Sequence, residues 1–170
     1  MYKLYKFYKN YILGGFRGFT LIELLVVVAV IGILAALMVT NLAGARDRAA
    51  DARKKAGLHA LKTALQLYQN NYHQFPATGN GLNLLACGAS GTSLCTSSFT
   101  AGGIEYMKKL PQNSSGQNEF RYYACDNRDD FRLKINLSNA SDPEILESQA
   151  HCPSNGCTSY GSTDYVVCAN

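Results

Sequence analysis

The sequence predicts an α+β fold in which a long N-terminal α-helix packs against a small antiparallel β-sheet. Three observations predict it. An apolar run over residues 19–42 continues into an amphipathic segment of helical period, short segments of alternating polarity follow residue 118, and all six cysteines follow residue 86. A chain of 170 residues has room for one small domain and an anchor, which leaves no room for a second, enzymatic domain.

The long helix begins with a segment that is apolar on every side. The run FTLIELLVVVAVIGILAALMVTNL over 19–42 reaches about 36 Å at the helical rise, which is enough to cross the core of a bilayer. No A-x-A site follows it, so we expect no cleavage after the apolar run. Lys and Arg flank it on both sides and leave its orientation open. The cysteines decide the orientation, because disulfides form outside the cytoplasm and place the C-terminal half there.

The first eighteen residues carry the excess charge of the chain. Four basic side chains and no acidic one precede Phe19, namely Lys3, Lys6, Lys9 and Arg17. Without these four, the 16 basic residues of the chain fall to 12, which equal the 12 acidic residues. The net charge of +4 therefore gives no argument for a nucleic-acid partner.

Glu23 is the one charged residue inside the apolar run. A charge costs at least about 2.5 kcal/mol near the centre of a membrane span and less near its end. The residues by themselves leave two explanations open. Either the carboxylate reaches the headgroup layer, or it pairs with a cation at the same depth. A cut between Gly18 and Phe19 would supply that cation as the new α-amino group of Phe19.

The residues around this position resemble a known family. They are similar to the processing and assembly motif of type IV prepilins and type II secretion pseudopilins. The shared features are a basic leader that ends in Gly18, Phe19 directly after it, Glu23 four residues beyond Phe19, and an uninterrupted aliphatic run. Weaker similarity to the major pseudopilin continues through residues 72–82 and 109–122. The clear match covers about the first quarter of the chain.

The resemblance implies how the chain is processed and where it acts. A membrane prepilin peptidase would cut between Gly18 and Phe19 and N-methylate Phe19, and Glu23 would meet the Phe19 amine of a neighbouring subunit. The partners would be identical subunits in a helical filament, the inner membrane before assembly, and the assembly platform with its ATPase. The chain would cross the inner membrane once, with its C-terminal half outside, and would then enter an extracellular pilus. The four parts would be a leader (1–18), a transmembrane and assembly helix (19–42), the amphipathic half of the same helix (43–75) and a disulfide-stapled head (76–170).

The helix continues beyond the membrane as an amphipathic segment. Its apolar stripe has the spacing of one helix face and consists of Leu58, Leu61, Leu65, Tyr68 and Tyr72. Pro76 pushes the residue before it out of the helical region, so we expect one helix over 19–74. We interpret the charged residues near its start, among them Asp51 with Lys54 and Lys55, as a solvated face rather than as salt bridges between subunits.

The head is expected to form three strands that pack on this stripe. Residues 119–125 and 131–137 predict two strands joined by a polar turn, and residues 164–168 predict a third strand. The glycine-rich stretch 77–103 predicts a loop with one short helix near 81–85. Residues 106–111 predict another short helical turn.

The six cysteines predict three disulfides, since exported thiols tend to oxidise. A zinc site at Cys152 and Cys157 beside His151 is the rival interpretation, but C-x2-C spacing is absent. Of the fifteen possible connectivities, we choose the one that closes two short loops and ties a strand end to the last strand. It consists of Cys87–Cys95, Cys152–Cys157 and Cys125–Cys168.

We predict a structural protein, the subunit of a type IV pilus, which polymerises through its apolar helix after peptidase cleavage. The alternatives are a pseudopilin of a type II secretion system, or a minor pilin for adhesion or DNA uptake. By the resemblance, a major pseudopilin usually carries an acidic calcium loop near its C-terminus and few disulfides, whereas Asp164 is the only acidic residue after Cys152.

Other functions find little support in the sequence. The H-E-x-x-H, G-x-S-x-G and P-loop motifs are absent, so we expect no enzyme, no cofactor and no metal. One basic aromatic group is too weak, beside its acidic neighbours, to predict specific nucleic-acid binding. It consists of Arg121, Tyr122, Tyr123, Arg128 and Arg132.

Overall fold

The computed structural model describes residues 18–79, 83–113 and 115–169, and of residues 39–43 it describes the backbone alone. The predicted leader therefore lies outside the described residues, apart from Gly18. The chain divides into two compact units, Met1–Ala43 and Gly44–Asn170. One helix, α2 (Leu21–Tyr72), belongs to both.

Helix α2 is 52 residues long and confirms the long helix that the sequence predicts. It begins after Thr20 and ends at Tyr72, two residues inside the predicted bounds at either end. His73 follows with a left-handed φ of 58°, and its N–H donates to the Gln69 carbonyl at 2.7 Å, which closes the last turn. The helix has thus already ended where Pro76 would have stopped it.

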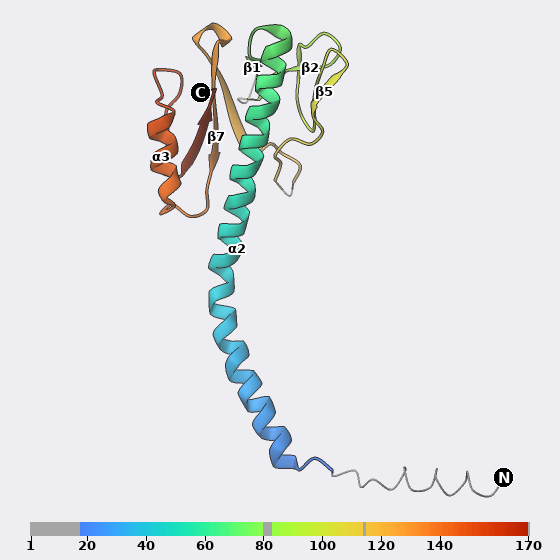
Figure 1. Ribbon diagram of the computed structural model, residues 1–170, viewed down its shortest axis with the longest axis vertical. Coiled ribbons are helices and arrows are strands. Elements are labelled where there is room, and N and C mark those ends of the chain that lie inside the picture. Colours follow the sequence, from blue (N-terminus) through green and yellow to red (C-terminus); the bar gives the residue numbers. More distant parts are fainter. Residues whose placement is uncertain (1–17, 80–82, 114, 170) are drawn as a thin grey trace, which may run out of the picture. The chain divides into compact units, whose positions relative to one another are not determined.

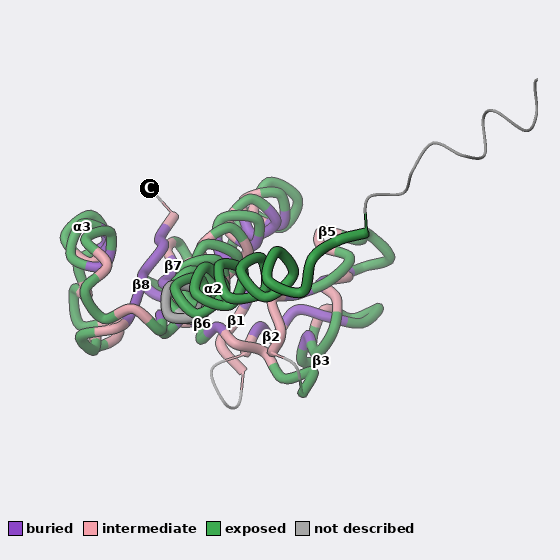
Figure 2. Tube along the Cα trace, turned by 90° about the horizontal axis from the view of Figure 1, so that it is seen from below, coloured by how far each residue is buried: buried purple, intermediate pink, exposed green. Residues whose placement is uncertain are grey.

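In the first unit, the apolar half of α2 is exposed along its length. Residues Leu21–Met38 are long and apolar enough to cross a membrane, with a mean hydropathy of 2.9. None of this segment is buried, and its large apolar side chains are 48–82 % exposed. Figure 2 shows the same segment as exposed throughout. Such a surface needs lipid or other helices around it.

In the second unit, the amphipathic half of α2 buries most of the predicted stripe. Leu58, Leu61 and Leu65 are completely buried, and Tyr68 nearly so. Tyr72 is the exception, since 43 % of it is exposed. Its ring stacks on that of Tyr68, with 4.4 Å between the ring centroids. The buried part of the stripe belongs to one core with side chains from all three sheets of the head.

The main sheet of the head has the strand order β6-β7-β8 and is antiparallel throughout. Its elements are β6 (Phe120–Cys125), the short helix η2 (Asp126–Arg128), β7 (Asp130–Asn136) and β8 (Asp164–Cys168). The three strands confirm the predicted ones to within one residue. Phe131, Leu133 and Ile135 of β7 join the core with the α2 stripe, as the alternation of this strand predicts. Figure 1 shows these strands alongside the head portion of α2.

The first part of the glycine-rich stretch forms strands, so the short helix predicted near 81–85 is wrong. Strand β2 (Leu84–Cys87) pairs with β1 (Ala77–Thr78) and with β3 (Ser93–Leu94). Leu84 and Ala86 are buried, whereas the residue between them is less so. This is the alternation of a strand rather than the face of a helix.

The helical turn predicted at 106–111 is also wrong. Strand β5 (Ile104–Met107) pairs with β4 (Phe99–Ala101) across the two-residue turn Gly102-Gly103. Both glycines have a positive φ, 57° and 80°, as tight hairpin turns of this kind require. A Gly-Gly pair between two apolar segments is the signal in the sequence that indicates this hairpin.

A helix that the sequence analysis does not include, α3 (Pro143–His151), packs beside β8. Asp142 caps it by accepting the Glu144 N–H at 3.0 Å, and Pro143 occupies the first helical turn. The Ser148 hydroxyl accepts a backbone N–H of β8 at 3.1 Å. The Asp-Pro-Glu run is the start signal that could have revealed this helix.

All six cysteines form disulfides, as predicted, but two of the three predicted pairs are wrong. The structure pairs Cys87–Cys95, Cys125–Cys157 and Cys152–Cys168, and not Cys125–Cys168 or Cys152–Cys157. Cys152 does not pair with Cys157 because it lies in one buried cluster with Cys168, at a Cα–Cα distance of 5.7 Å. For Cys125–Cys168, the physical reason lies in the strand order. Strand β7 separates β6 from β8, which places these two strands about 9–10 Å apart, beyond the roughly 7 Å that a disulfide spans between Cα atoms.

Candidate assembly site

The start of α2 holds Glu23, the residue predicted to direct assembly. The Thr20 N–H and hydroxyl both donate to Glu23 Oε2, at 2.9 and 2.7 Å, and the Glu23 N–H donates to the Thr20 hydroxyl oxygen at 3.3 Å. This reciprocal pair is a capping box, which satisfies N–H groups at the helix start that have no partner within the helix. The Thr-x-x-Glu spacing is the signal in the sequence for this capping box, a role of Glu23 that is not among the predictions above.

Glu23 also lines a shallow groove of about 350 Å³ on the first unit. The other side chains that line the groove are apolar: Phe19, Ile22, Val26 and Val27. Among the described residues, only Thr20 donates a hydrogen bond to Glu23. Between apolar helices or in lipid, a carboxylate attracts a nearby cation strongly because the dielectric constant is low. The groove can therefore receive one cationic group.

Gly18 and Phe19, the predicted cleavage and methylation site, precede the helix and are not part of it. Both residues are exposed, Phe19 to 81 %. The bond between them is therefore accessible, in contrast to the hydrogen-bonded turns that follow. The cut and the methylation stay predictions.

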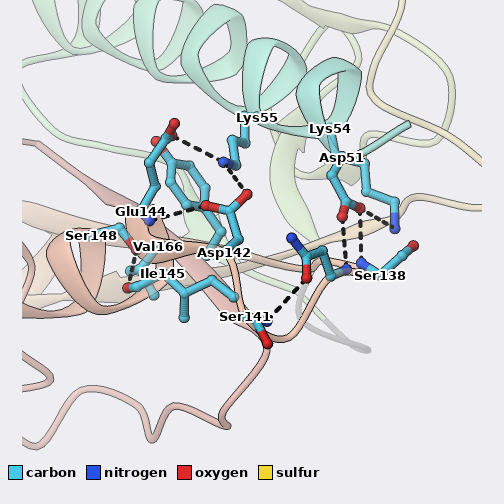
Figure 3. A network of polar contacts seen from close by, with 12 residues as sticks. Asp51, Lys54, Lys55, Ser138, Ser141, Asp142, Glu144, Ile145, Ser148 and Val166 are labelled. Carbon is cyan, nitrogen blue, oxygen red and sulfur yellow. Dashed lines mark hydrogen bonds and ion pairs between the residues drawn. The ribbon is translucent and has the colours of Figure 1, made fainter. Parts of the chain in front are cut away.

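A polar network in the second unit holds the loop after β7 against α2 (Figure 3). Asp51 is 2 % exposed, and its two oxygens accept the N–H groups of Ser138 and Asn139 at 2.8 and 2.9 Å. Lys54 lies 3.8 Å from the same carboxylate and donates to the Asn136 carbonyl at 2.9 Å. The interpretation of Asp51 as part of a solvated face is therefore wrong. Helical periodicity does not reveal that a loop 87 residues later supplies two N–H donors.

Lys55 joins α2 to the start of α3 through a second set of contacts (Figure 3). Its ammonium lies 2.6 Å from Asp142 and 3.0 Å from Glu144. Asp142 uses its other oxygen to cap α3, so one carboxylate both starts this helix and binds it to α2. The Lys55 ammonium also lies 5.4 Å from the centroid of the Tyr165 ring on β8.

These contacts shift the pKa values of three groups. Burial alone would raise the pKa of Asp51, but the two N–H groups of the loop and the Lys54 charge outweigh it and hold that pKa below its ordinary value. The hydrogen bond from Lys55 lowers the pKa of Asp142. Burial would lower the pKa of Lys55, but the hydrogen bonds to its two carboxylate partners raise it overall.

Replacing Asp51 by asparagine is expected to destabilise the head by about 2 kcal/mol at neutral pH, because an amide presents an NH₂ group to one of the two N–H donors. A lowered pKa contributes stability that is present above the ordinary aspartate pKa and is lost as the pH falls through the lowered value. The difference in unfolding free energy between the two proteins should therefore shrink below about pH 4. Denaturant unfolding followed by tyrosine fluorescence measures it.

Asp47→Asn is the matched control, since Asp47 is exposed and lies one helical turn earlier in α2. It should change the unfolding free energy by less than about 0.5 kcal/mol. Equal stability of Asp51→Asn and Asp47→Asn at neutral pH would contradict the role assigned to Asp51.

Two other candidate sites considered from the sequence do not form. Tyr122 and Arg132 of the basic aromatic group are buried and donate to the carbonyls of Pro76 and Pro153, so they do not offer a surface for nucleic acid. The cysteines of the possible zinc site are in disulfides. Within the described part of the chain, no three His, Cys, Asp or Glu side chains are placed to hold a metal ion.

Comparison with known families adds to this geometry. Residues 14–39 match the prokaryotic N-terminal methylation motif. Residues 41–139, more than half of the chain, match the family of type II secretion system (T2SS) protein G. The chain belongs to the T2SS protein G family. The match covers the amphipathic half of α2 and the head through β7, so membership of the protein G family does not rest on the methylation motif alone.

Curated relatives of this protein G family member support the assignment. It is 36 % identical over 84 residues to the type II secretion system core protein G of Aeromonas hydrophila, 35 % over 84 residues to that of Escherichia coli K12, and 35 % over 90 residues to that of Vibrio cholerae. These alignments cover 49–53 % of this chain. The chain spans only 56–58 % of the length of the relatives that it matches. No solved structure matches it.

Proposed function

We propose that this protein is a pseudopilin of a type II secretion system, a structural subunit that polymerises through the apolar half of α2. The observation that carries the proposal is the protein G match over residues 41–139, which extends far beyond the N-terminal motif. This alternative now has better support than the type IV pilus that the sequence analysis preferred. Similarity along most of the head outweighs a preference that rested on the number of disulfides and of acidic residues.

In this proposal, assembly begins with the cut between Gly18 and Phe19. The cut removes the basic leader and leaves the Phe19 α-amino group at the start of an exposed apolar helix. The Glu23 carboxylate lies in a groove that Phe19 itself lines. When apolar helices pack, the amine of one subunit and Glu23 of its neighbour neutralise each other, which offsets the cost of taking either charge out of water.

The remaining partners in the proposal follow from this assembly step. They are identical subunits, a prepilin peptidase, the inner membrane before assembly, and an assembly platform with its ATPase. The head lies outside the cytoplasm, in agreement with its three disulfides. The protein acts as a structural element and has no catalytic role of its own.

Deletion of the gene in the source bacterium, followed by analysis of the culture supernatant, tests the proposal. Loss of secreted proteins from the supernatant, with their accumulation in the cell envelope, is the expected result. A plasmid copy should restore secretion, and mass spectrometry of the restored protein should find a chain that begins at methylated Phe19.

The type IV pilus gives the opposite result in the same experiment. The three disulfides are the observation that still favours it. If deletion removed surface fibres and left secretion unchanged, the pseudopilin proposal would be wrong and the pilus interpretation would replace it. A mature protein that kept residues 1–18 would contradict both.

A further inference from the structure

The segment between α3 and β8 covers the outer face of the main sheet and is held there by side chains of β7. Phe131, Leu133 and Ile135 of β7 belong to the core, so the residues that alternate with them face the other way. Each of these outward side chains forms hydrogen bonds to the covering segment, residues 152–163, or to the first residue of β8. Arg132 donates to the Pro153 carbonyl at 3.1 Å, and Asn136 donates to the Thr163 hydroxyl at 3.1 Å.

Lys134 makes the central contact of this set. Its ammonium donates to the Ser159 carbonyl at 2.9 Å and to Asp164 Oδ2 at 3.0 Å, and it lies 5.7 Å from the centroid of the Tyr123 ring. The side chain of Lys134 is 12 % exposed and that of Asp164 is 6 % exposed. A carbonyl oxygen, a carboxylate oxygen and an aromatic face thus surround one positive charge, as they would surround a bound cation.

Both oxygens of Asp164 already accept hydrogen bonds from neighbouring groups. Its Oδ2 accepts the Gly161 N–H at 2.8 Å in addition to Lys134, and its Oδ1 accepts the Asn136 amide at 2.9 Å. Calcium requires six to eight oxygen ligands, usually with several carboxylates. This segment and the start of β8 offer one carboxylate, that of Asp164, which accepts from three donors and has a fixed positive charge 3.0 Å from it. A calcium ion of the kind that major pseudopilins usually carry therefore does not fit these residues.

We propose that the Lys134 ammonium is the resident cation of this segment and that it closes the segment without a metal ion. The Cys152–Cys168 and Cys125–Cys157 disulfides hold the same segment at Cys152 and Cys157. This inference rests on the proposed function, because the comparison with calcium-binding major pseudopilins applies only if the protein is a pseudopilin. The head of this pseudopilin keeps its fold whether or not calcium is present outside the cell, and it depends on oxidised cysteines instead.

The test uses the mature full-length chain in detergent, with thermal unfolding followed by near-UV circular dichroism of its tyrosines. Calcium is raised from chelated trace levels to about 10 mM, above the roughly 0.1–1 mM at which extracellular modules bind it. The unfolding midpoint of the wild type is expected to stay within about 1 °C across this range. A saturable rise in the midpoint with calcium would overturn the proposal.

Three variants test the role of Lys134 itself. Lys134→Met removes the charge and is expected to lower the midpoint by roughly 4–8 °C, whereas Lys134→Arg keeps a cation and should recover most of that loss. Lys108→Met is the matched control, because Lys108 is exposed and makes no hydrogen bond or ion pair with another described residue. Its midpoint should equal that of the wild type.

Each outcome for these variants decides the question. If Lys134→Met does not fold while Lys134→Arg and Lys108→Met do, the need for a cation is supported. If Lys134→Met behaves like Lys108→Met, or if Lys134→Arg loses as much stability as Lys134→Met, the proposal is overturned. Because unfolding of the purified chain does not require a secretion system, this result is independent of the deletion experiment that tests the proposed function.

Discussion

Replacing Glu23 by glutamine is expected to abolish filament assembly and to leave the start of α2 intact. Glutamine can take the place of glutamate in a capping box, so it still accepts the Thr20 N–H. It cannot neutralise the amine of Phe19, and an unpaired ammonium among apolar helices costs several kcal/mol at every subunit. Since about 1.4 kcal/mol corresponds to a factor of ten in an equilibrium constant, the amount of sheared filament should fall by more than about tenfold. Immunoblots of sheared and membrane fractions measure it.

Thr20→Ala is the matched control, because it removes the hydroxyl of the capping box and keeps the Glu23 charge. It should weaken the helix start by about 1 kcal/mol and preserve most of the assembly. Both variants should appear in the membrane as chains that begin at residue 19, which mass spectrometry can check. If Glu23→Gln assembled normally while Thr20→Ala did not, the importance of Glu23 would lie in capping α2 and not in its charge.

Removing the Cys125–Cys157 disulfide is expected to lower the unfolding free energy of the head by about 3–4 kcal/mol. This disulfide joins residues 32 positions apart, the largest separation of the three, and the loss of chain entropy that it imposes on the unfolded state grows with that separation. The expected loss is a large share of the roughly 5–15 kcal/mol that stabilises a typical domain. Denaturant unfolding of the Cys125→Ala/Cys157→Ala double variant measures it.

Cys87→Ala/Cys95→Ala is the matched control, since this disulfide joins residues only 8 positions apart. The same entropy argument gives a smaller loss of about 2–3 kcal/mol. Mass spectrometry of non-reduced peptides checks the connectivity directly. A peptide that links Cys125 to Cys168 in the native protein would contradict both the strand order and this prediction.

The two predictions concern separate properties of the molecule. Glu23 lies in the first unit and affects the interaction between subunits, whereas Cys125–Cys157 lies in the second and affects the stability of one head. A Glu23→Gln protein should therefore unfold like the wild type in denaturant. A disulfide variant should still be cut after Gly18, because the bond after Gly18 belongs to the other unit.

The sequence by itself determined the features that depend on residues close together in the chain. The apolar run, the stripe of leucines and the alternation of β7 each repeat with the period of one element, so they indicate the long helix and the main sheet directly. The family resemblance at residues 18–25 is local in the same way. The Thr20–Glu23 capping box, the Gly102-Gly103 hairpin and the Asp142 cap are local signals of the same kind.

Only the tertiary structure decided the contacts between residues far apart in the sequence. The sequence predicts a solvated position for Asp51, but in the structure a loop 87 residues later donates two N–H groups to its carboxylate. The sequence favours a pairing of Cys125 with Cys168, and this pairing fails because β7 lies between their strands. From its position in a strand, Lys134 is predicted only to face away from the core. Its role as the resident cation depends on the Ser159 carbonyl and the Asp164 carboxylate, which accept hydrogen bonds from its ammonium. Each of these contacts joins residues that are far apart in the sequence, and the periodicity of a single helix or strand does not indicate which distant residues meet.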